Sequence, residues 1–275
     1  MNKRKTGAGK SPRKLLTILV LSAMAASGLA HAADATGPNA VYIQQLGSTN
    51  TITIEQVGGT NQVGGITNST AFGIDGGTGA YTWTPAAASS SNYGTINGSN
   101  NQVAITQHGN VNTAQYNIIG GHNQYTSSVT GNNNQTYLSI GDANNGTNNY
   151  NTVNETIVGS TNLVSTQLIG SHNNVTTSIT GGNNTINNSV STSYGSISST
   201  TTGNYNIYNF QQTDSAGANG HGLIVTTVGD YNSITTQQQG TNDTSVNINT
   251  LGDHNTITVR TSSNTIVGPR SALAR

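Results

Sequence analysis

The chain has 275 residues, of which nine are Lys or Arg and nine are Asp or Glu, and it contains no cysteine. Six of the basic residues precede residue 15, so the rest of the chain has three arginines against nine acids, a net charge of about −6, and no lysine. Nucleic acid and anionic membrane surfaces both require basic patches, so neither is an expected partner. Without cysteine no disulfide can stabilise the fold, and a hydrophobic content of 32% is low for an ordinary core.

The first 32 residues have the pattern of a secretory signal. A basic head precedes the apolar run from Leu15 to Leu21, and Ala30-His31-Ala32 is a small-x-small cleavage site. We therefore expect residues 1–32 to be removed and the mature chain to begin at Ala33. The apolar run is too short to cross a membrane and no later run is long enough, so the sequence predicts no membrane span.

From Asn39 onward the chain repeats the eleven-residue pattern Asn-x-φ-x-φ-x-Gln-x-Gly-x-x, in which φ is an apolar residue. Segments 39–47, 50–58 and 101–109 match it closely. A short fixed period means that one unit cannot bury its own apolar side chains and must stack on its neighbours. The function is therefore expected to lie in the stack and not in a cleft.

The repeat predicts short strands joined by turns. Side chains alternate between the two faces of a strand, so positions 0, 2, 4 and 6 of the unit share one face. That face carries Asn, two apolar residues and Gln, whereas the other face carries Thr, Ser, Asn and Gln. Two units make one coil of about 22 residues. We therefore predict an all-β fold, a parallel β-solenoid of two facing sheets and about seven coils that spans residues 33–268.

Each position of the unit has a structural role. Inward Asn and Gln are expected to form hydrogen-bonded ladders along the axis. Gly supplies the positive φ of the turn, and the turn Asn either tolerates positive φ as well or forms a local hydrogen bond. The predicted assembly-ladder residues are Asn39, Gln45, Asn50, Gln56, Asn101, Gln107, Asn112, Asn232 and Gln238. The predicted apolar core residues are Val41, Ile43, Ile52, Ile54, Val103, Ile105, Val164, Ile179, Ile234 and Ile257. The predicted turn residues are Gly47, Gly58, Gly109, Gly120, Gly131, Gly159, Gly170, Gly181, Gly229 and Gly240.

The inward pattern shifts in the middle of the chain. Position 6 becomes apolar there, as at Ile157, and position 4 becomes polar, as at Thr166 and Thr177. Glu155 falls at an inward position 4. Because an inward carboxylate is costly, a local bulge or a register slip in this unit is an equal alternative to a buried acid.

Four stretches interrupt the period. The largest, residues 62–97, contains Trp83, the single tryptophan of the sequence. The shorter ones lie near residues 142–150, 191–203 and 213–221. Their Gly, Ser and Asn content predicts loops that extend from turns of one solenoid domain. Residues 269–275 leave the pattern and are expected to form a flexible tail.

The spacing Asn-x-φ-x-φ-x-Gln-x-Gly-x-x-Asn resembles the curlin repeat of bacterial curli subunits, most closely over residues 39–61, 101–112, 206–212 and 232–240. The resemblance implies export through the periplasm of a Gram-negative bacterium and a dedicated outer-membrane pore. It also implies polymerisation outside the cell into functional amyloid fibres of the biofilm matrix, which mediate adhesion and aggregation. The implied partners are further copies of the chain, a nucleator paralogue and the secretion pore. The chain differs from a typical five-repeat curlin in having more units, middle units without Gln, and the 62–97 insertion.

A soluble surface adhesin or carbohydrate-binding solenoid is the main alternative to a fibre subunit. Tyrosines that are expected to be exposed, and the segment around Trp83, could stack on sugars. These tyrosines are Tyr42, Tyr150, Tyr205 and Tyr231. Ice binding is a third hypothesis, but the Thr-x-Thr pairs at 51–53 and 256–258 are too scattered to favour it.

Enzymatic activity is not expected. The acids are sparse and mostly at turns, and the sequence has no nucleophile or phosphate-binding motif. His122, His172 and His254 are separated by several units, so we interpret them as exposed turn residues and expect neither a metal site nor a cofactor.

Overall fold

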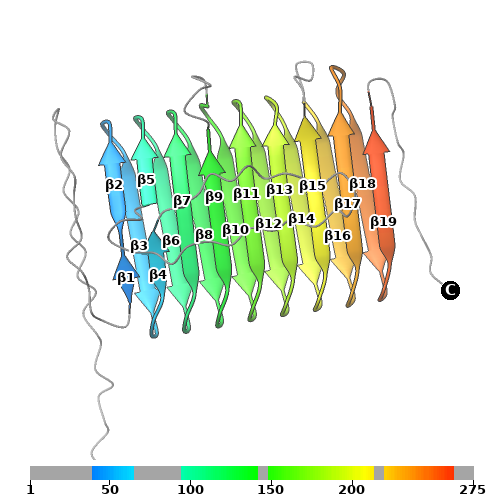
Figure 1. Ribbon diagram of the computed structural model, residues 1–275, viewed down its shortest axis with the longest axis horizontal. Helices are drawn as coiled ribbons and strands as arrows, with labels where there is room; N and C mark the ends of the chain where they lie inside the picture. The colour runs from blue at the N-terminus through cyan, green and yellow to red at the C-terminus, as the bar shows by residue number, and fades with distance from the viewer. Residues whose placement is uncertain (1–38, 65–93, 142–147, 214–219, 263–275) are drawn as a thin grey trace, which may run out of the picture.

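The computed structural model describes residues 39–64, 94–141, 148–213 and 220–262, and over these ranges the chain forms strands and turns without a helix. The strands lie in two parallel sheets that face each other and are stacked along one axis in chain order (Figure 1). These ranges accordingly hold no helix long and apolar enough to cross a membrane. The prediction of an all-β parallel solenoid is confirmed, whereas the signal segment, Trp83 and the tail lie outside the described residues.

The odd-numbered strands other than β3, together with β2 and β4, form sheet A, and β3 with the remaining even-numbered strands forms sheet B. Sheet A contains β1 (Ala40–Val41), β2 (Ile43–Leu46), β4 (Gln62–Gly64), β5 (Gly94–Asn97), β7 (Thr113–Ile119), β9 (Gln135–Ile140), β11 (Leu163–Ile169), β13 (Thr185–Ser191), β15 (Ile207–Thr213), β17 (Ser233–Gln239) and β19 (Thr256–Thr261). Sheet B contains β3 (Thr51–Val57), β6 (Gln102–His108), β8 (Gln124–Thr130), β10 (Thr152–Val158), β12 (Asn174–Thr180), β14 (Ser196–Thr202), β16 (Gly222–Val228) and β18 (Ser245–Leu251).

The two sheets differ in length by one level of the stack, where a level is one strand or two short strands that lie end to end. In sheet A, β1 and β2 together occupy one level, and β4 and β5 together occupy the next. The eleven strands of sheet A therefore form nine levels, whereas the eight strands of sheet B form eight. The solenoid therefore has about eight coils, one more than the sequence predicts. One source of the difference is β14, which falls in the 191–203 stretch where the repeat is lost. Its one apolar residue is Ile197, yet all seven residues pair in register with β12 and β16.

The largest interruption of the repeat lies within a strand level and not at a turn. Gln62–Gly64 and Gly94–Asn97, which the sequence analysis assigns to the 62–97 insertion, are the strands β4 and β5. β4 pairs with β1 and with the first half of β7, whereas β5 pairs with β2 and with the second half of β7. The two flanks of the insertion together thus complete one level of sheet A.

The middle coils have no bulge. β10 pairs residue for residue with β8 and β12 over its whole length, so that Glu155 lies between Ser127 and Thr177. Of the alternatives left open by the sequence, the structure therefore has the buried acid. Position 6 carries the apolar contact here, with Ile157 and Ile179 both fully buried.

The turns explain the glycine period. All ten predicted turn glycines have positive φ, as with Gly109 at 116°. A Cβ on Gly109 would lie 2.0 Å from the carbonyl oxygen of Gly131 in the next coil, so no larger residue fits. Most turns have a second left-handed residue, and it is the one before the ladder Asn, for example Val111 at φ 59°, so of the two alternatives for the turn Asn the positive φ is not the one adopted. The Asn side chain is therefore free to point inward.

We expect the stacking of turns to dominate the effect of glycine substitutions. Gly252 has a similar φ of 110°, but its Cβ would meet no atom closer than 3.8 Å. Gly252→Ala should therefore cost only backbone strain, about 1–3 kcal/mol of unfolding free energy. Gly109→Ala should cost about 1–3 kcal/mol more because it also pushes two coils apart. Urea unfolding of the soluble chain measures both, and equal losses would contradict close stacking at Gly109.

Candidate assembly ladders and solenoid ends

An unbroken asparagine ladder runs the full length of sheet A, with one residue before each strand level. Its members are Asn39, Asn61, Asn112, Asn134, Asn162, Asn184, Asn206, Asn232 and Asn255. At each step the backbone N–H of one Asn donates to the Oδ1 of the preceding Asn, over 2.8–3.0 Å. From Asn134 onward the side-chain Nδ2 donates to the same oxygen as well.

Each ladder Asn inside the stack links three coils. Asn162 donates from its Nδ2 to Oδ1 of Asn134 in the coil before, at 3.0 Å, and to the carbonyl oxygen of Gly181 in the turn of the coil after, at 2.8 Å. Because Asn162 is 1% exposed, these partners replace the water that its amide would otherwise bind. The ladder thus satisfies buried polar groups only through stacking, and it ties the turns to the strands.

The ladder of sheet B is incomplete. It begins with Asn50, Asn101, Asn123, Asn151 and Asn173. The next three levels carry Gly195, His221 and Thr244 instead; His221 Nδ1 lies 2.9 Å from Thr244 Oγ1. Gly195 has no room for a side chain, since its Cβ would lie 2.7 Å from Oε1 of Gln212. The polar continuity that reaches the C-terminal end of sheet A is therefore lost in sheet B.

The predicted glutamines form two separate pairs and no continuous ladder. Gln56 donates from Nε2 to Oε1 of Gln107 at 2.9 Å, near the start of sheet B. Gln212 donates in the same way to Gln238 at 2.9 Å, near the end of sheet A. Gln45 lies beside Ile96 in its sheet and makes no such pair. The glutamines therefore support the two ends of the solenoid, while the asparagines run through it.

The structure contains more ladder residues than the sequence predicts. The members that the prediction misses share the position before a strand and an eleven-residue spacing, which is the signal that could have found them. They are Asn61, Asn123, Asn134, Asn151, Asn162, Asn173, Asn184, Asn206 and Asn255. All ten predicted core residues point inward; those that are only partly buried are Ile43, Ile52 and Ile257, at the two ends of the stack.

The two ends of sheet A have complementary hydrogen-bonding groups. At the C-terminal end, Oδ1 of Asn255 accepts no hydrogen bond from the described part of the chain. At the N-terminal end, the backbone N–H of Asn39 donates to none of the described residues, and its Nδ2 makes one contact, to the carbonyl oxygen of Gly58 at 3.3 Å. The ladder is thus open with an acceptor at one end and a donor at the other.

The middle of the core holds a polar network that joins the two sheets. Glu155 is 1% exposed; its Oε2 accepts a hydrogen bond from the Tyr125 hydroxyl at 3.0 Å, and its Oε1 accepts one from Oγ1 of Thr166 at 3.1 Å. Asn188 Nδ2 in turn donates to Thr166 at 3.2 Å and to Thr177 at 3.1 Å. Burial raises the pKa of the Glu155 carboxyl to about 7, against the smaller opposite effect of the two hydroxyl donors.

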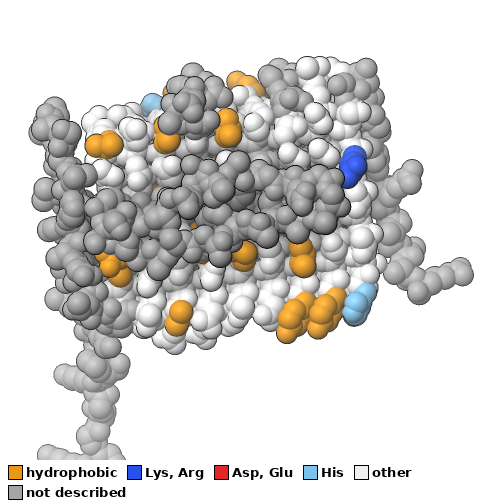
Figure 2. Space-filling model, viewed as in Figure 1, with side chains coloured by type: hydrophobic (Ala, Val, Ile, Leu, Met, Phe, Trp, Pro, Cys, Tyr) orange, Lys and Arg blue, Asp and Glu red, His pale blue; other side chains and the backbone are white. Residues whose placement is uncertain are grey.

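Aromatic side chains form two columns at the left-handed turn position. His122, Tyr150, His172 and Tyr194 stack in one column, with adjacent ring centroids 4.7–5.1 Å apart. The other column consists of Tyr205, Tyr231 and His254. Figure 2 shows hydrophobic and histidine side chains of the described residues in small groups along the edges, where the turns lie.

These columns change the interpretation of the exposed aromatic residues. Tyr150 and Tyr231 are about half exposed, but each lies inside a column with both ring faces against its neighbours, which leaves none for a sugar. Tyr205, at the end of its column, stacks one ring face on Tyr231. Tyr42, predicted to be exposed, is 7% exposed and clusters with Ala40. Tyr150 separates His122 from His172, and no group of metal-binding side chains occurs among the described residues.

Comparison with known proteins gives no match to a family model, to a curated protein or to a solved structure. The geometry of the ladders and the solenoid ends is therefore the basis for a functional conclusion.

The buried acid predicts a pH dependence of stability. The native pKa of Glu155 is raised to about 7 from 4.5, so the unfolded chain loses its proton at lower pH than the native chain does. Stability should therefore fall as pH rises from about 4.5 to 7, by about 3 kcal/mol in total, and then level off.

Glu155→Gln should remove most of this pH dependence, because the amide stays neutral. Urea unfolding at pH 5 and pH 8 measures it. Glu55→Gln, at an exposed carboxylate on the outer face of sheet B, is the matched control and should leave the dependence intact. An unchanged slope in Glu155→Gln would show that Glu155 is not the buried titrating group.

Proposed function

We propose that this protein is a secreted structural subunit that assembles end to end into an extracellular fibre. The observation that carries the proposal is the sheet A ladder, which is continuous through the molecule and open at both ends. A second copy placed with its Asn39 beyond Asn255 would offer N–H donors to the unpaired Oδ1 of Asn255. The same hydrogen bonds that join successive coils would then join successive molecules.

Unpaired strand edges support this contact. β19 and the level formed by β1 and β2 are the last strands of sheet A on either side, and each has one edge without a partner strand among the described residues. An open edge of a parallel sheet presents rows of N–H and C=O groups that can pair with another chain. The chain places no proline within these edge strands, and their single charge is that of Arg260 on the outer face.

The apolar side chains at the two ends also match. With Asn39 beyond Asn255, parallel register would place Val41 on Ile257 and Ile43 on Val259. All four are inward positions, and Ile43, Ile257 and Val259 are only partly buried because the stack ends there. Their burial at the junction would add a hydrophobic contribution to that of the backbone hydrogen bonds.

The junction should depend mainly on sheet A. Because sheet A has nine levels and sheet B eight, a straight continuation of sheet A leaves one strand level empty between β18 and the β3 of the next copy. Sheet B also ends in Thr244 and not in a ladder Asn. We therefore expect substitutions at the sheet A ends to impair growth more than equivalent substitutions in β18.

The wider setting of the proposal comes from the sequence. The segment 1–32 supports export, and the resemblance to the curlin repeat supports an outer-membrane pore, a nucleator paralogue and a role in adhesion and aggregation within a biofilm matrix. The fold is compatible with each of these, since parallel in-register strands are the arrangement found in amyloid.

Seeded and unseeded growth of residues 33–275 tests the proposal, followed by thioflavin-T fluorescence and electron microscopy. We expect seedable fibres. Ile257→Lys combined with Val259→Lys places two charges on the inward face of β19 and should slow elongation of seeds at least about tenfold, which corresponds to about 1.4 kcal/mol.

The matched control puts lysines on the other face of the same strand, through Thr256→Lys and Thr258→Lys, and should change the rate less than about twofold. A persistent soluble monomer with β-rich circular dichroism would overturn the fibre and favour the soluble adhesin. Equal slowing by both variants would contradict growth through the inward face of sheet A.

A further inference from the structure

Over the described residues, the outer face of sheet B is exposed along its whole length, whereas that of sheet A is not. On sheet A the third residue of several strands is buried although it points away from the core, as at Gln115, Tyr137 and Asn187. On sheet B every outward position of all eight strands is exposed or partly exposed. The eight strands of sheet B also pair in one continuous order from β3 to β18.

A column of methyl-bearing side chains runs along this face. The column consists of the last residue of each sheet B strand, which bears a methyl group in every strand except β6, where it is a histidine; the residues are in register from coil to coil and are Val57, His108, Thr130, Val158, Thr180, Thr202, Val228 and Leu251. Val57, Val158, Val228 and Leu251 are 45–67% exposed. The outer face of sheet A has one large hydrophobic residue with comparable exposure among the described residues, Ile207 at 50%. Exposed apolar side chains are thus concentrated on sheet B, and concentrations of this kind mark interaction surfaces.

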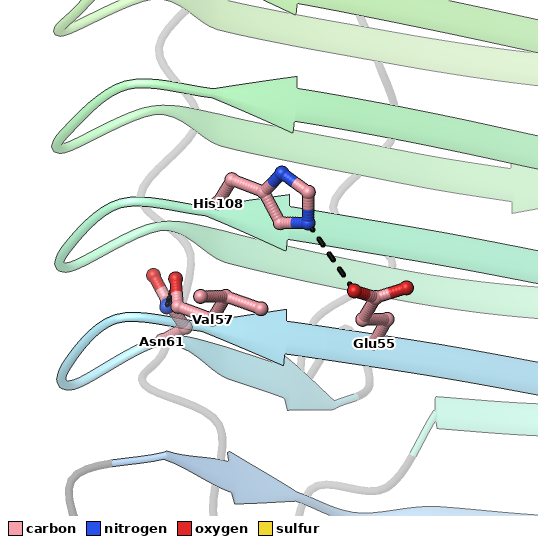
Figure 3. A network of polar contacts seen from close by, with 4 residues as sticks. All are labelled: Glu55, Val57, Asn61 and His108. Atoms are coloured by element: carbon pink, nitrogen blue, oxygen red, sulfur yellow. Dashed lines mark hydrogen bonds and ion pairs between the residues drawn. The ribbon is translucent and has the colours of Figure 1, made fainter. Parts of the chain in front are cut away.

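The same face carries almost no charge. Its one acidic side chain is Glu55, whose Oε1 lies 3.4 Å from Nε2 of His108 near the N-terminal end of the sheet (Figure 3). The outward positions of the six strands from β8 to β18 have no Asp, Glu, Lys, Arg or His. Two copies of a chain with a net charge of about −6 can therefore approach through this face without placing like charges opposite each other.

The area is sufficient for a stable contact. Eight levels about 4.8 Å apart and seven residues of about 3.3 Å each give a face of roughly 900 Å². A stable protein interface buries about 800 Å² on each partner. We propose that the outer face of sheet B is a lateral interface on which a second copy of this chain packs, sheet B against sheet B.

This pairing builds on the proposed fibre, because end-to-end growth repeats the face along the axis and multiplies the contact. In such a pair, the outer face of sheet B in one copy lies against the same face of the other copy. The methyl column of each copy then packs on the facing sheet and excludes water. Fibres would then consist of paired solenoid filaments. The surface that controls their thickness would be separate from the ends that control their length.

Cysteine cross-linking tests the face directly, because the chain has no cysteine of its own. Ser178 lies near the middle of the outer face of sheet B and Ser189 on the outer face of sheet A, and both are partly exposed. Under mild oxidation, Ser178→Cys should form covalent dimers at least about tenfold faster than Ser189→Cys, an advantage equivalent to about 1.4 kcal/mol of pairing free energy. Equal rates would overturn the proposal.

Filament width gives a second test. Val158→Lys with Val228→Lys should convert paired filaments into single ones in electron micrographs, while seed elongation changes less than about twofold. Ile207→Lys is the matched control on sheet A and should leave pairs intact. Wild-type filaments that are always single, or double-lysine filaments that stay paired, would overturn the proposal. Single wild-type filaments that bind cellulose, with binding lost in the double variant, would instead assign the face to a polysaccharide.

The test of the lateral interface can be separated from the test of the proposed fibre. If no fibres form, the fibre proposal fails, and sedimentation of the soluble chain then tests the face alone. A dimer that the two lysines dissociate supports the lateral interface, whereas a monomer contradicts it.

Discussion

Every coil of this protein depends on the next coil to satisfy its polar groups. An Asn such as Asn162 is almost completely buried and bonds to the coil on either side, and Gly109 packs its backbone against Gly131 with no room for a side chain. A chain with few apolar residues and no disulfide can fold in this way because stacking supplies the hydrogen bonds as well as the burial. The same dependence leaves the first and last coils unsatisfied. The assembly that we propose would follow directly from how the coil is stabilised.

The interior can also hold polar groups that an ordinary core would exclude. Glu155 is accommodated because the Tyr125 and Thr166 hydroxyls reach it from both sheets. In the same coils, position 6 of the repeat unit carries the buried apolar side chain, as at Ile157, because position 4 is polar. Some costs remain, since Oε1 of Gln56 and Oδ1 of Asn188 have no partner among the described residues. The solenoid therefore tolerates variation in its units as long as the backbone register is kept.

Much of the fold follows from the sequence, since a strict eleven-residue period fixes strands, inward positions and glycine turns. The sequence does not predict those parts of the fold in which the backbone forms strands or turns although the side-chain pattern is absent. β14 has one apolar residue, Ile197, and joins the sheet through its two neighbours. β4 and β5 share a level although 29 residues separate them. The aromatic columns require knowing that the residue before each Asn is left-handed and points outward, as at Tyr150. The open ends of the ladder could not be predicted, because the sequence does not show which Asn lacks a partner.

The central claim is that folded solenoids add end to end, and the mass per unit length of a single filament tests it most directly. Nine levels of sheet A at about 4.8 Å predict one chain per roughly 43 Å of filament, measured by scanning transmission electron microscopy. A value near one chain per 4.8 Å would mean that each chain unfolds and occupies one layer, and would contradict the account.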